Sequence, residues 1–396
     1  MIVQKYKDML GAKSVIREIS EYANQRGSEI GYENVFDYSL GNPSVPVPEK
    51  FNTIVKELLE TREPLALHGY SPSHGLPEVR KKIADYLSKR FGLPYKMEDI
   101  FMTSGAAGAI AHAARAVADI GDEIITFAPY FPEYGPYINE TGAVLKVVPA
   151  DTENFQINFE AFAAMCNEKT AAVLINTPNN PSGIVYSTET IEKLAQILKE
   201  KEKQFGHPLY IISDEPYREI LFQGADSPCV SAIYDNTLMC YSFSKSLSIP
   251  GERIGYVAVC PNCKDAALIV DMCTQISRGI GHNCPSSLIQ LAVAEMLDET
   301  AELSVYETNM NILYEELTKL GFTCVKPGGT FYIFPKAPIP DAKKFCKDAL
   351  KYDLCLVPGD TFGCPGYFRM SYCIQTEKVK RSLEAIRKIA KDYGMQ

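Results

Sequence analysis

Residues 242–256 read SFSKSLSIPGERIGY, and they place a lysine in a setting where lysine is uncommon. Lys245 follows an apolar run and lies among Ser242, Ser244 and Ser246, and Arg253 comes eight residues later (253 − 245 = 8) after a Pro-Gly turn. Lysine side chains are usually exposed, so a lysine at the end of an apolar strand needs an explanation. The planar donor fork of arginine and the short hydrogen bonds of serine hydroxyls are suited to binding a phosphate group.

The segments around this stretch alternate between strand-like and helix-like patterns. Short runs rich in Val, Ile and Tyr predict strands at 122–128, 142–150, 170–176, 208–217, 237–245 and 254–260. Longer runs with helical spacing predict helices at 75–91, 104–120 and 187–205. This alternation is typical of an α/β fold with a mostly parallel sheet covered by helices on both faces.

The pattern changes near residue 285, where long helical stretches and short strands replace the alternation. The later segments predict a helical region at 286–320, strands at 321–325, 330–334, 354–358 and 367–372, and a final helix at 376–394. A chain of 396 residues is too long for one simple core. We therefore predict a large domain over 46–290 and a smaller α+β domain formed by 1–45 and 291–396.

Several reactive side chains come directly after predicted strands. Asn180 follows the strand at 170–176, Asp214 and Tyr217 close the strand at 208–217, and Lys245 closes the next one. Ligands of open α/β sheets bind beyond the carboxyl ends of the strands, so we expect these side chains to meet at one edge.

A lysine beside a bound phosphate is a candidate for forming a Schiff base with a phosphorylated aldehyde, and that description fits pyridoxal phosphate. Such a cofactor needs a carboxylate beside its pyridine nitrogen, for which Asp214 is suited, and donors to its ring oxygen, for which Asn180 and Tyr217 are suited. Phe131 or Tyr130 offers an aromatic partner for the ring. The small residues in TSGAAGAI (103–110) open a helix whose free N–H groups favour an anion.

The ordered set of motifs resembles that of the pyridoxal-phosphate aminotransferases of the aspartate aminotransferase family over nearly the whole chain. The motifs that carry the resemblance are LGNPS (40–44), YSPSHGLPEVR (70–80), NTPNNPSG (176–183), SDEPY (213–217), SFSKSLSIPGERIGY and FRMSY (368–372). Together they are far more specific than any one of them alone.

The resemblance implies a large cofactor-binding domain and a role for each matching residue. Lys245 would hold the cofactor and move the proton of the substrate Cα, and Asp214 would pair with the pyridine nitrogen. The implied phosphate donors are Ser242, Ser244, Arg253 and the helix start at Gly105, Ala106 and Ala107. Phe131 would stack on the ring, Asn180 and Tyr217 would bond the ring oxygen, and Arg369 would clamp the substrate carboxylate with Gly41 and Asn180 beside it. Tyr70 would reach the phosphate of a second subunit, which implies a homodimer with shared sites.

Two positions depart from the family pattern. Phe131 stands where aspartate-specific relatives often have tryptophan, and Ala107 replaces a hydroxyl residue often found at the start of the phosphate helix. Arg278, in the segment SRGIGHNCPSS (277–287), lies where one subgroup of the family has an arginine for the side-chain carboxylate of aspartate or glutamate. We therefore expect transamination between a dicarboxylic amino acid and a 2-oxo acid.

Two other functions use similar residues and stay open at this point. A C–S β-lyase would employ the same site, and a cofactor-binding regulator would lack turnover, although the chain has no helix-turn-helix region. The net charge of −9 argues against a nucleic-acid or anionic-membrane partner, and no apolar run is long enough to cross a bilayer. Twelve scattered cysteines and a start without signal-peptide features predict a cytoplasmic protein with free thiols. Cys260 and Cys263 have metal-ligand spacing but no matching second pair, so we predict ordinary thiols and no metal.

Overall fold

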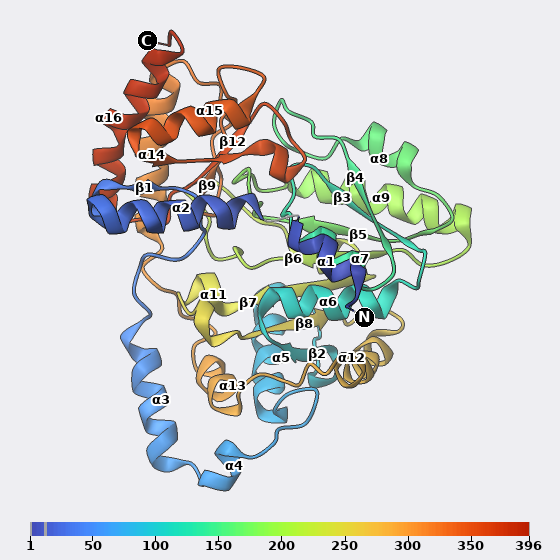
Figure 1. Ribbon diagram of the computed structural model, residues 1–396. Helices are drawn as coiled ribbons and strands as arrows, with labels where there is room; N and C mark the ends of the chain where they lie inside the picture. Colours follow the sequence, from blue (N-terminus) through green and yellow to red (C-terminus); the bar gives the residue numbers. More distant parts are fainter. Residues whose placement is uncertain (1, 12–13, 396) are drawn as a thin grey trace.

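The structure is a computed structural model that describes residues 2–11 and 14–395. Its centre is a seven-stranded sheet in the order β2-β8-β7-β6-β5-β3-β4 (Figure 1). The strands are β2 (Ile100–Thr103), β3 (Glu123–Phe127), β4 (Val144–Val148), β5 (Thr170–Asn176), β6 (Tyr210–Asp214), β7 (Thr237–Ser242) and β8 (Gly255–Val259). All neighbouring pairs are parallel except the two that involve β8, so the predicted mixed, mostly parallel sheet is confirmed.

Helices cover both faces of this sheet, because its central strands are apolar on both sides. Every residue of β5 and of β7 is buried. One face packs against α6 (Gly105–Val117), α7 (Tyr134–Asn139) and α12 (Ala266–Ile280). The other face packs against α8 (Phe159–Met165), α9 (Thr188–Phe205) and α10 (Val230–Ile233), and, further along, α3 (Glu49–Thr61), α4 (Pro64–His68), α5 (Pro77–Phe91) and α13 (Ser287–Ala294).

A second group of elements packs around its own apolar core. Strands β11 (Val357–Pro358), β12 (Phe368–Ser371) and β9 (Tyr332–Ile333) form an antiparallel sheet, and β1 (Phe36–Asp37) pairs in parallel with β10 (Leu354–Cys355). The helices are α14 (Ser304–Lys319), α15 (Ala342–Ala349) and α16 (Thr376–Asp392). Arg387 of α16 donates two hydrogen bonds, of 2.6 and 3.0 Å, to the Glu316 carboxylate of α14.

The N-terminal helices contact both groups of elements. In α1 (Gln4–Gly11), Lys5 forms an ion pair of 2.9 Å with Glu140, which follows α7. In α2 (Val15–Ile30), Arg26 instead pairs at 2.7 Å with Asp353, next to β10. The division into 46–290 and 1–45 with 291–396 stays a prediction, and residues 1, 12, 13 and 396 lie outside the described residues.

Several predicted elements are wrong in detail. The predicted strand at 237–245 ends at Ser242, because Phe243–Ser246 form a helical turn, α11, so Lys245 does not lie in the strand. The predicted strand at 321–325 is irregular, because Gly321 ends α14 with a φ of +87° and Phe322 turns into the core. The helical region at 286–320 is interrupted between α13 and α14, where the Ala301 N–H donates to the Ser246 carbonyl at 2.7 Å. The strand at 354–358 consists of β10 and β11, which belong to different sheets. In the region at 286–320, a tertiary contact overrides the local pattern.

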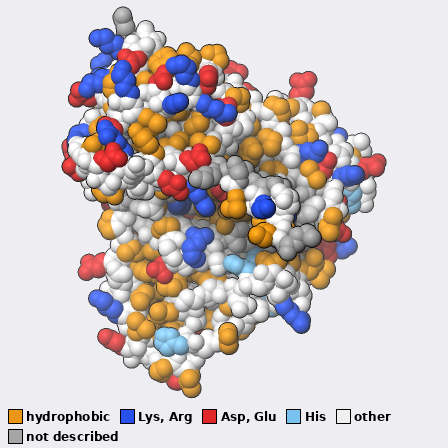
Figure 2. All heavy atoms as spheres, viewed as in Figure 1, with side chains coloured by type: hydrophobic (Ala, Val, Ile, Leu, Met, Phe, Trp, Pro, Cys, Tyr) orange, Lys and Arg blue, Asp and Glu red, His pale blue; other side chains and the backbone are white. Residues whose placement is uncertain are grey.

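The described surface mixes both signs of charge. Figure 2 shows Lys and Arg side chains interspersed with Asp and Glu on the visible face, without a large patch of one sign. Within residues 2–11 and 14–395, no helix combines the length and apolar character needed to cross a lipid bilayer.

A close approach of two glycines positions the start of α6 on β8. A Cβ on Gly255 would lie 3.0 Å from the Gly105 Cα and would also collide with the Tyr241 carbonyl oxygen. Gly255→Ala is therefore expected to lower the free energy of unfolding by about 1–3 kcal/mol, because backbone atoms must shift to admit a methyl group. Gly251→Ala is the control, since a Cβ at that position meets nothing within 4 Å. Urea unfolding of both variants measures the effect, and equal midpoints would contradict it.

Candidate active site

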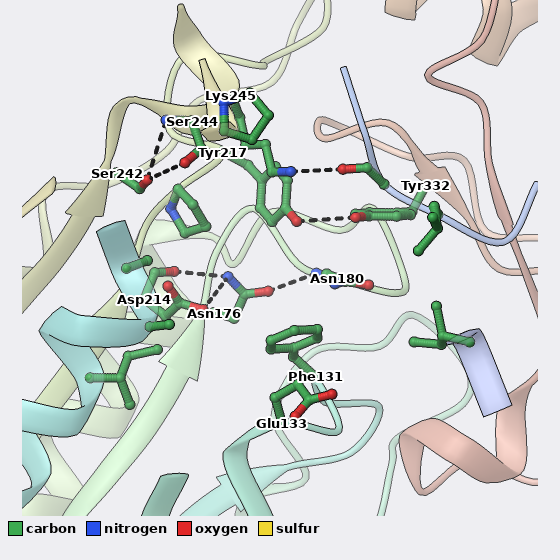
Figure 3. A pocket seen from close by; sticks show the side chains of 18 of the residues that line it. Phe131, Glu133, Asn176, Asn180, Asp214, Tyr217, Ser242, Ser244, Lys245 and Tyr332 are labelled. Atoms are coloured by element: carbon green, nitrogen blue, oxygen red, sulfur yellow. Dashed lines mark hydrogen bonds between the residues drawn. The ribbon is translucent and has the colours of Figure 1, made fainter. Parts of the chain in front are cut away.

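A pocket of about 490 Å³ lies beyond the carboxyl ends of β5, β6 and β7 (Figure 3). Its lining includes most of the predicted site residues, which come from segments far apart in the chain. These are Gly41, Ala106, Ala107, Phe131, Asn180, Asp214, Tyr217, Ser242, Ser244, Lys245, Arg253 and Arg369. The parallel sheet explains the meeting, because each parallel strand delivers the residue that follows it to the same edge.

Lys245 lies in α11 (Phe243–Ser246), the single helical turn that follows β7. Its amine donates a 2.7 Å hydrogen bond to the Gly41 carbonyl and lies 5.5 Å from the centre of the Phe331 ring. Loss of hydration lowers the pKa of Lys245 to about 8, and Arg253 and Arg369 lower it further, against an opposing effect of Cys373. A larger share of this amine is therefore neutral near pH 7 than for an ordinary lysine, which favours action as a base or nucleophile.

Asp214 ends β6 and is 5% exposed. One carboxylate oxygen, Oδ2, accepts a 2.5 Å hydrogen bond from the Tyr134 hydroxyl and a longer one, of 3.4 Å, from the Asn176 amide. The other oxygen, Oδ1, is buried and has no hydrogen-bond partner in the described structure. Burial raises the pKa of Asp214 to about 7, although the Tyr134 hydroxyl opposes this rise. A cationic donor in the pocket would satisfy Oδ1 and stabilise the ionised carboxylate.

Two tyrosines connect the large sheet to the second group of elements. The hydroxyls of Tyr217 and Tyr332 share a 3.1 Å hydrogen bond, and burial raises the pKa of Tyr217 well above its usual value. A Cβ on Gly41 would collide with the Tyr332 hydroxyl. Because Gly41 has no side chain, both the Tyr332 hydroxyl and the Lys245 amine can lie close to the Gly41 backbone.

Donors for an anion gather at one end of the pocket. The Ser242 hydroxyl donates to the Ser244 hydroxyl at 2.8 Å, and Arg253 donates to the carbonyls of Ser104 and Pro250 at 3.2 and 3.1 Å. Ala106 and Ala107 lie in the first turn of α6, and no side chain caps this helix start. Gly105 has a φ of +75°, and a Cβ on it would lie 3.0 Å from Arg253. Serine hydroxyls, an arginine and free helical N–H groups thus converge, as an anion site requires.

Arg369 is a buried arginine without a carboxylate partner among the described residues. Its side chain is 2% exposed; it donates to Asn180 Oδ1 at 3.0 Å and to the Ser39 carbonyl, and Nε has no partner. The guanidinium lies 4.6 Å from the centre of the Tyr332 ring, and burial lowers its pKa. Buried charges are normally paired, so this cation is suited to a ligand carboxylate.

The remaining predicted residues separate into those inside and those outside the pocket. Phe131 lines it, whereas Tyr130 packs beside Tyr134 with ring centres 6.4 Å apart. Tyr70 is fully exposed and lines a different hollow with Asn283 and Cys284. Arg278 is exposed at the end of α12. The structure therefore does not bring Tyr70 or Arg278 to the pocket of their own chain.

Sequence reasoning missed several residues of the pocket region, among them five with polar side chains that contact the site or line it. Tyr134 and Asn176 hold Asp214, Tyr332 bonds Tyr217, and Arg17 and Glu133 line the pocket. Asn176 ends a predicted strand, so the edge rule that found Asp214 also applied to it. Nothing in the local pattern marked the other four. Among the described residues, no group of three or more His, Cys, Asp or Glu side chains could hold a metal ion.

Known proteins resemble this chain both in sequence and in structure. Residues 33–386 match the family model described as aminotransferase class I and II. The aspartate aminotransferase of Thermotoga maritima is 31% identical over 362 residues, which cover 89% of this chain and 91% of the relative. A probable aspartate/prephenate aminotransferase of Aquifex aeolicus is 32% identical over 373 residues, which cover 90% and 91%.

Solved structures extend the comparison to the whole fold. The crystal structure of an amino transferase from Eubacterium rectale has a TM-score of 0.96 and 46% identity, and the match covers 99% of each chain. That of the Thermotoga maritima aspartate aminotransferase has a TM-score of 0.86 and 29% identity, over 96% of this chain and 97% of the other. The chain therefore belongs to the class I and II aminotransferases, a family of pyridoxal-phosphate-dependent transaminases.

Proposed function

We propose that the protein transfers an amino group between an amino acid and a 2-oxo acid in a ping-pong reaction, with pyridoxal phosphate held on Lys245. The observation that carries the proposal is the pairing, in one pocket, of a poorly hydrated lysine with a buried carboxylate that has one unsatisfied oxygen. The named relatives support transamination as the outcome, rather than β-elimination or regulation without turnover.

The residues fit the cofactor at each of its functional groups. Asp214 Oδ1 lacks a donor, which a protonated pyridine nitrogen would supply. Ser242, Ser244, Arg253 and the amides of Ala106 and Ala107 would hold the phosphate, Asn180 and Tyr217 the ring oxygen, and Phe131 the ring face. When bound, pyridoxal phosphate supplies an aldehyde that condenses with amines and a cationic ring that withdraws electrons from the substrate Cα.

The side chains of this chain then divide the work of the reaction. Arg369 would bind the substrate α-carboxylate with Asn180 and the Gly41 backbone beside it, which directs the Cα toward Lys245. Nζ of Lys245, once free, would remove the proton from the substrate Cα and deliver it to the cofactor carbon. An amine with a pKa of about 8 is close to the best basicity for this transfer at neutral pH. Asp214 would remain ionised and keep the ring cationic.

The proposal includes a homodimer and a dicarboxylic substrate. Tyr70 is fully exposed and Arg278 is exposed, so both are accessible to a second copy of the chain, where they would meet a phosphate and a substrate side chain. The names of the aspartate aminotransferase relatives support aspartate or glutamate as one substrate. All twelve cysteines are free, which suits the reducing conditions of the cytoplasm that we propose as the location.

Replacing the lysine tests the central assignment. Lys245→Ala is expected to lower transamination by at least about 10²–10⁴-fold, because the proton carrier is lost, and to abolish the absorbance of lysine-bound cofactor. Lys169→Ala, at an exposed lysine, is the control and should match the unchanged protein. Turnover is measured with an amino acid panel and 2-oxoglutarate, and retained activity in Lys245→Ala would disprove the assignment.

The titration of Asp214 gives a pH-dependent prediction for cofactor-free protein. Its pKa is raised from 3.8 to about 7, so the folded state binds the extra proton and loses stability as pH rises through this window. Asp214→Asn cannot titrate and should gain stability relative to the unchanged protein between pH 4 and pH 8, as measured by urea unfolding. Asp226→Asn, at an exposed aspartate, is the control for the substitution itself. A constant difference for Asp214→Asn would mean that its carboxyl is not destabilised by burial.

The arginine assigned to a second copy has its own test. Arg278→Ala is expected to reduce kcat/KM for aspartate by about ten- to a hundredfold, the usual effect of losing a charge-assisted hydrogen bond, and to change alanine far less. Arg381→Ala, on the outer face of α16, serves as control. Equal losses for aspartate and alanine would remove the dicarboxylate assignment while leaving transamination intact.

A further inference from the structure

Two opposite charges without partners line the active-site pocket. Arg17 lies in the first turn of α2, and Glu133 directly precedes α7. Within residues 2–11 and 14–395, neither side chain forms a hydrogen bond or an ion pair, with the other or with any third residue. Figure 3 shows Glu133 beyond Phe131, at the end of the pocket away from Lys245.

Tyr137 indicates that both charges act on the same region of the pocket. Its pKa is raised to about 12, mainly by burial and then by Glu133 and Asp214, and is lowered by Arg253 and Arg17. Tyr137 lines the pocket, so Arg17 and Glu133 are both within electrostatic reach of one wall. Both residues also line the neighbouring groove beneath α1, which places them where the pocket opens outward.

The position of Arg17 is unfavourable for the helix that carries it. The amino end of a helix is positive and prefers acidic side chains, so a cation in its first turn is destabilising. Glu133 does not cap α7 either, since its side chain makes no bond to the helix start. Arg17 is exposed and Glu133 is partly exposed, and no described residue pairs with either charge. Together, the two opposite charges are complementary to a ligand group that carries both charges.

We infer that Arg17 and Glu133 recognise the far end of an amino acid that bears both an amine and a carboxylate there, that is, a bis-amino acid. This inference rests on the proposed transamination and names its second substrate. A ping-pong enzyme binds two different amino acids in one site, so the dicarboxylic substrate and the bis-amino acid alternate. Arg369 holds the near carboxylate, Arg17 the far carboxylate and Glu133 the far amine.

Four amino acids with six or seven carbon atoms test the contributions of Arg17 and Glu133 separately. The probes are LL-2,6-diaminopimelate with both far groups, 2-aminopimelate with the carboxylate only, lysine with the amine only, and norleucine with neither. The half-reaction of cofactor-loaded protein is followed by absorbance in a single turnover, without any 2-oxo acid. For the unchanged protein, we expect diaminopimelate to be the best of the four, by about tenfold or more over norleucine.

Each variant that removes one charge should change the half-reaction rates, relative to norleucine, for a different set of probes. Arg17→Gln should lower the ratio of diaminopimelate to norleucine, and of 2-aminopimelate to norleucine, by about ten- to a hundredfold. Glu133→Gln should lower the ratios for diaminopimelate and lysine, and raise the ratio for 2-aminopimelate by removing repulsion. Glu18→Gln is the matched control, because Glu18 lines the groove but not the pocket.

A second measurement does not depend on turnover. Pimelate carries two carboxylates and no amine, so its dissociation constant, measured by calorimetry, should rise about tenfold in Arg17→Gln and fall in Glu133→Gln. Equal losses for all four amino acids, or unchanged pimelate affinity in both variants, would overturn the inference. A protein that converts none of the probes, nor alanine, nor glutamate would instead refute the proposed transamination.

Discussion

The burial of Asp214 without a countercharge is the constraint on which the site depends. One of its oxygens is held by Tyr134 and Asn176, and the other faces the pocket unpaired. An unpaired buried acceptor is destabilising, and the surrounding sheet must supply the stability that keeps it in place. The fully buried strands β5 and β7 on either side of β6 do so, because they fix the backbone of Asp214 from both neighbours.

Lys245 and Arg369 are likewise poorly hydrated charges, but they are cations, and neither has a carboxylate partner in the described structure. The charged side chains that line the pocket are four cations, at Arg17, Lys245, Arg253 and Arg369, and two anions, at Glu133 and Asp214. This excess of positive charge is complementary to anionic ligands. Stability is thus exchanged for affinity, as is common where function requires groups that folding alone would not favour.

Much of this arrangement was accessible from sequence, and the exceptions have physical causes. The alternating segments from residue 75 to residue 260 predicted the sheet and its helices, because each strand is apolar along its length. The end of each strand then located Asp214, Asn180 and Lys245. Tyr332 and Arg17 were not predicted, because their positions depend on how distant segments pack against the sheet and not on a local pattern. Tyr70 and Arg278 were predicted from a resemblance, and one chain alone does not bring them to its own pocket.

The irregular segment between α13 and α14 constrains the length of the chain at that point. The Ala301 N–H donates a hydrogen bond to the Ser246 carbonyl, in the helical turn that carries Lys245. This bond attaches the segment that joins the two groups of elements to that turn. A residue inserted or deleted there would move Ala301 and, through this hydrogen bond, Ser246, which follows Lys245 in the chain. Homologues of this protein should consequently tolerate changes of composition in residues 297–303 more readily than changes of length, although the segment has no regular secondary structure.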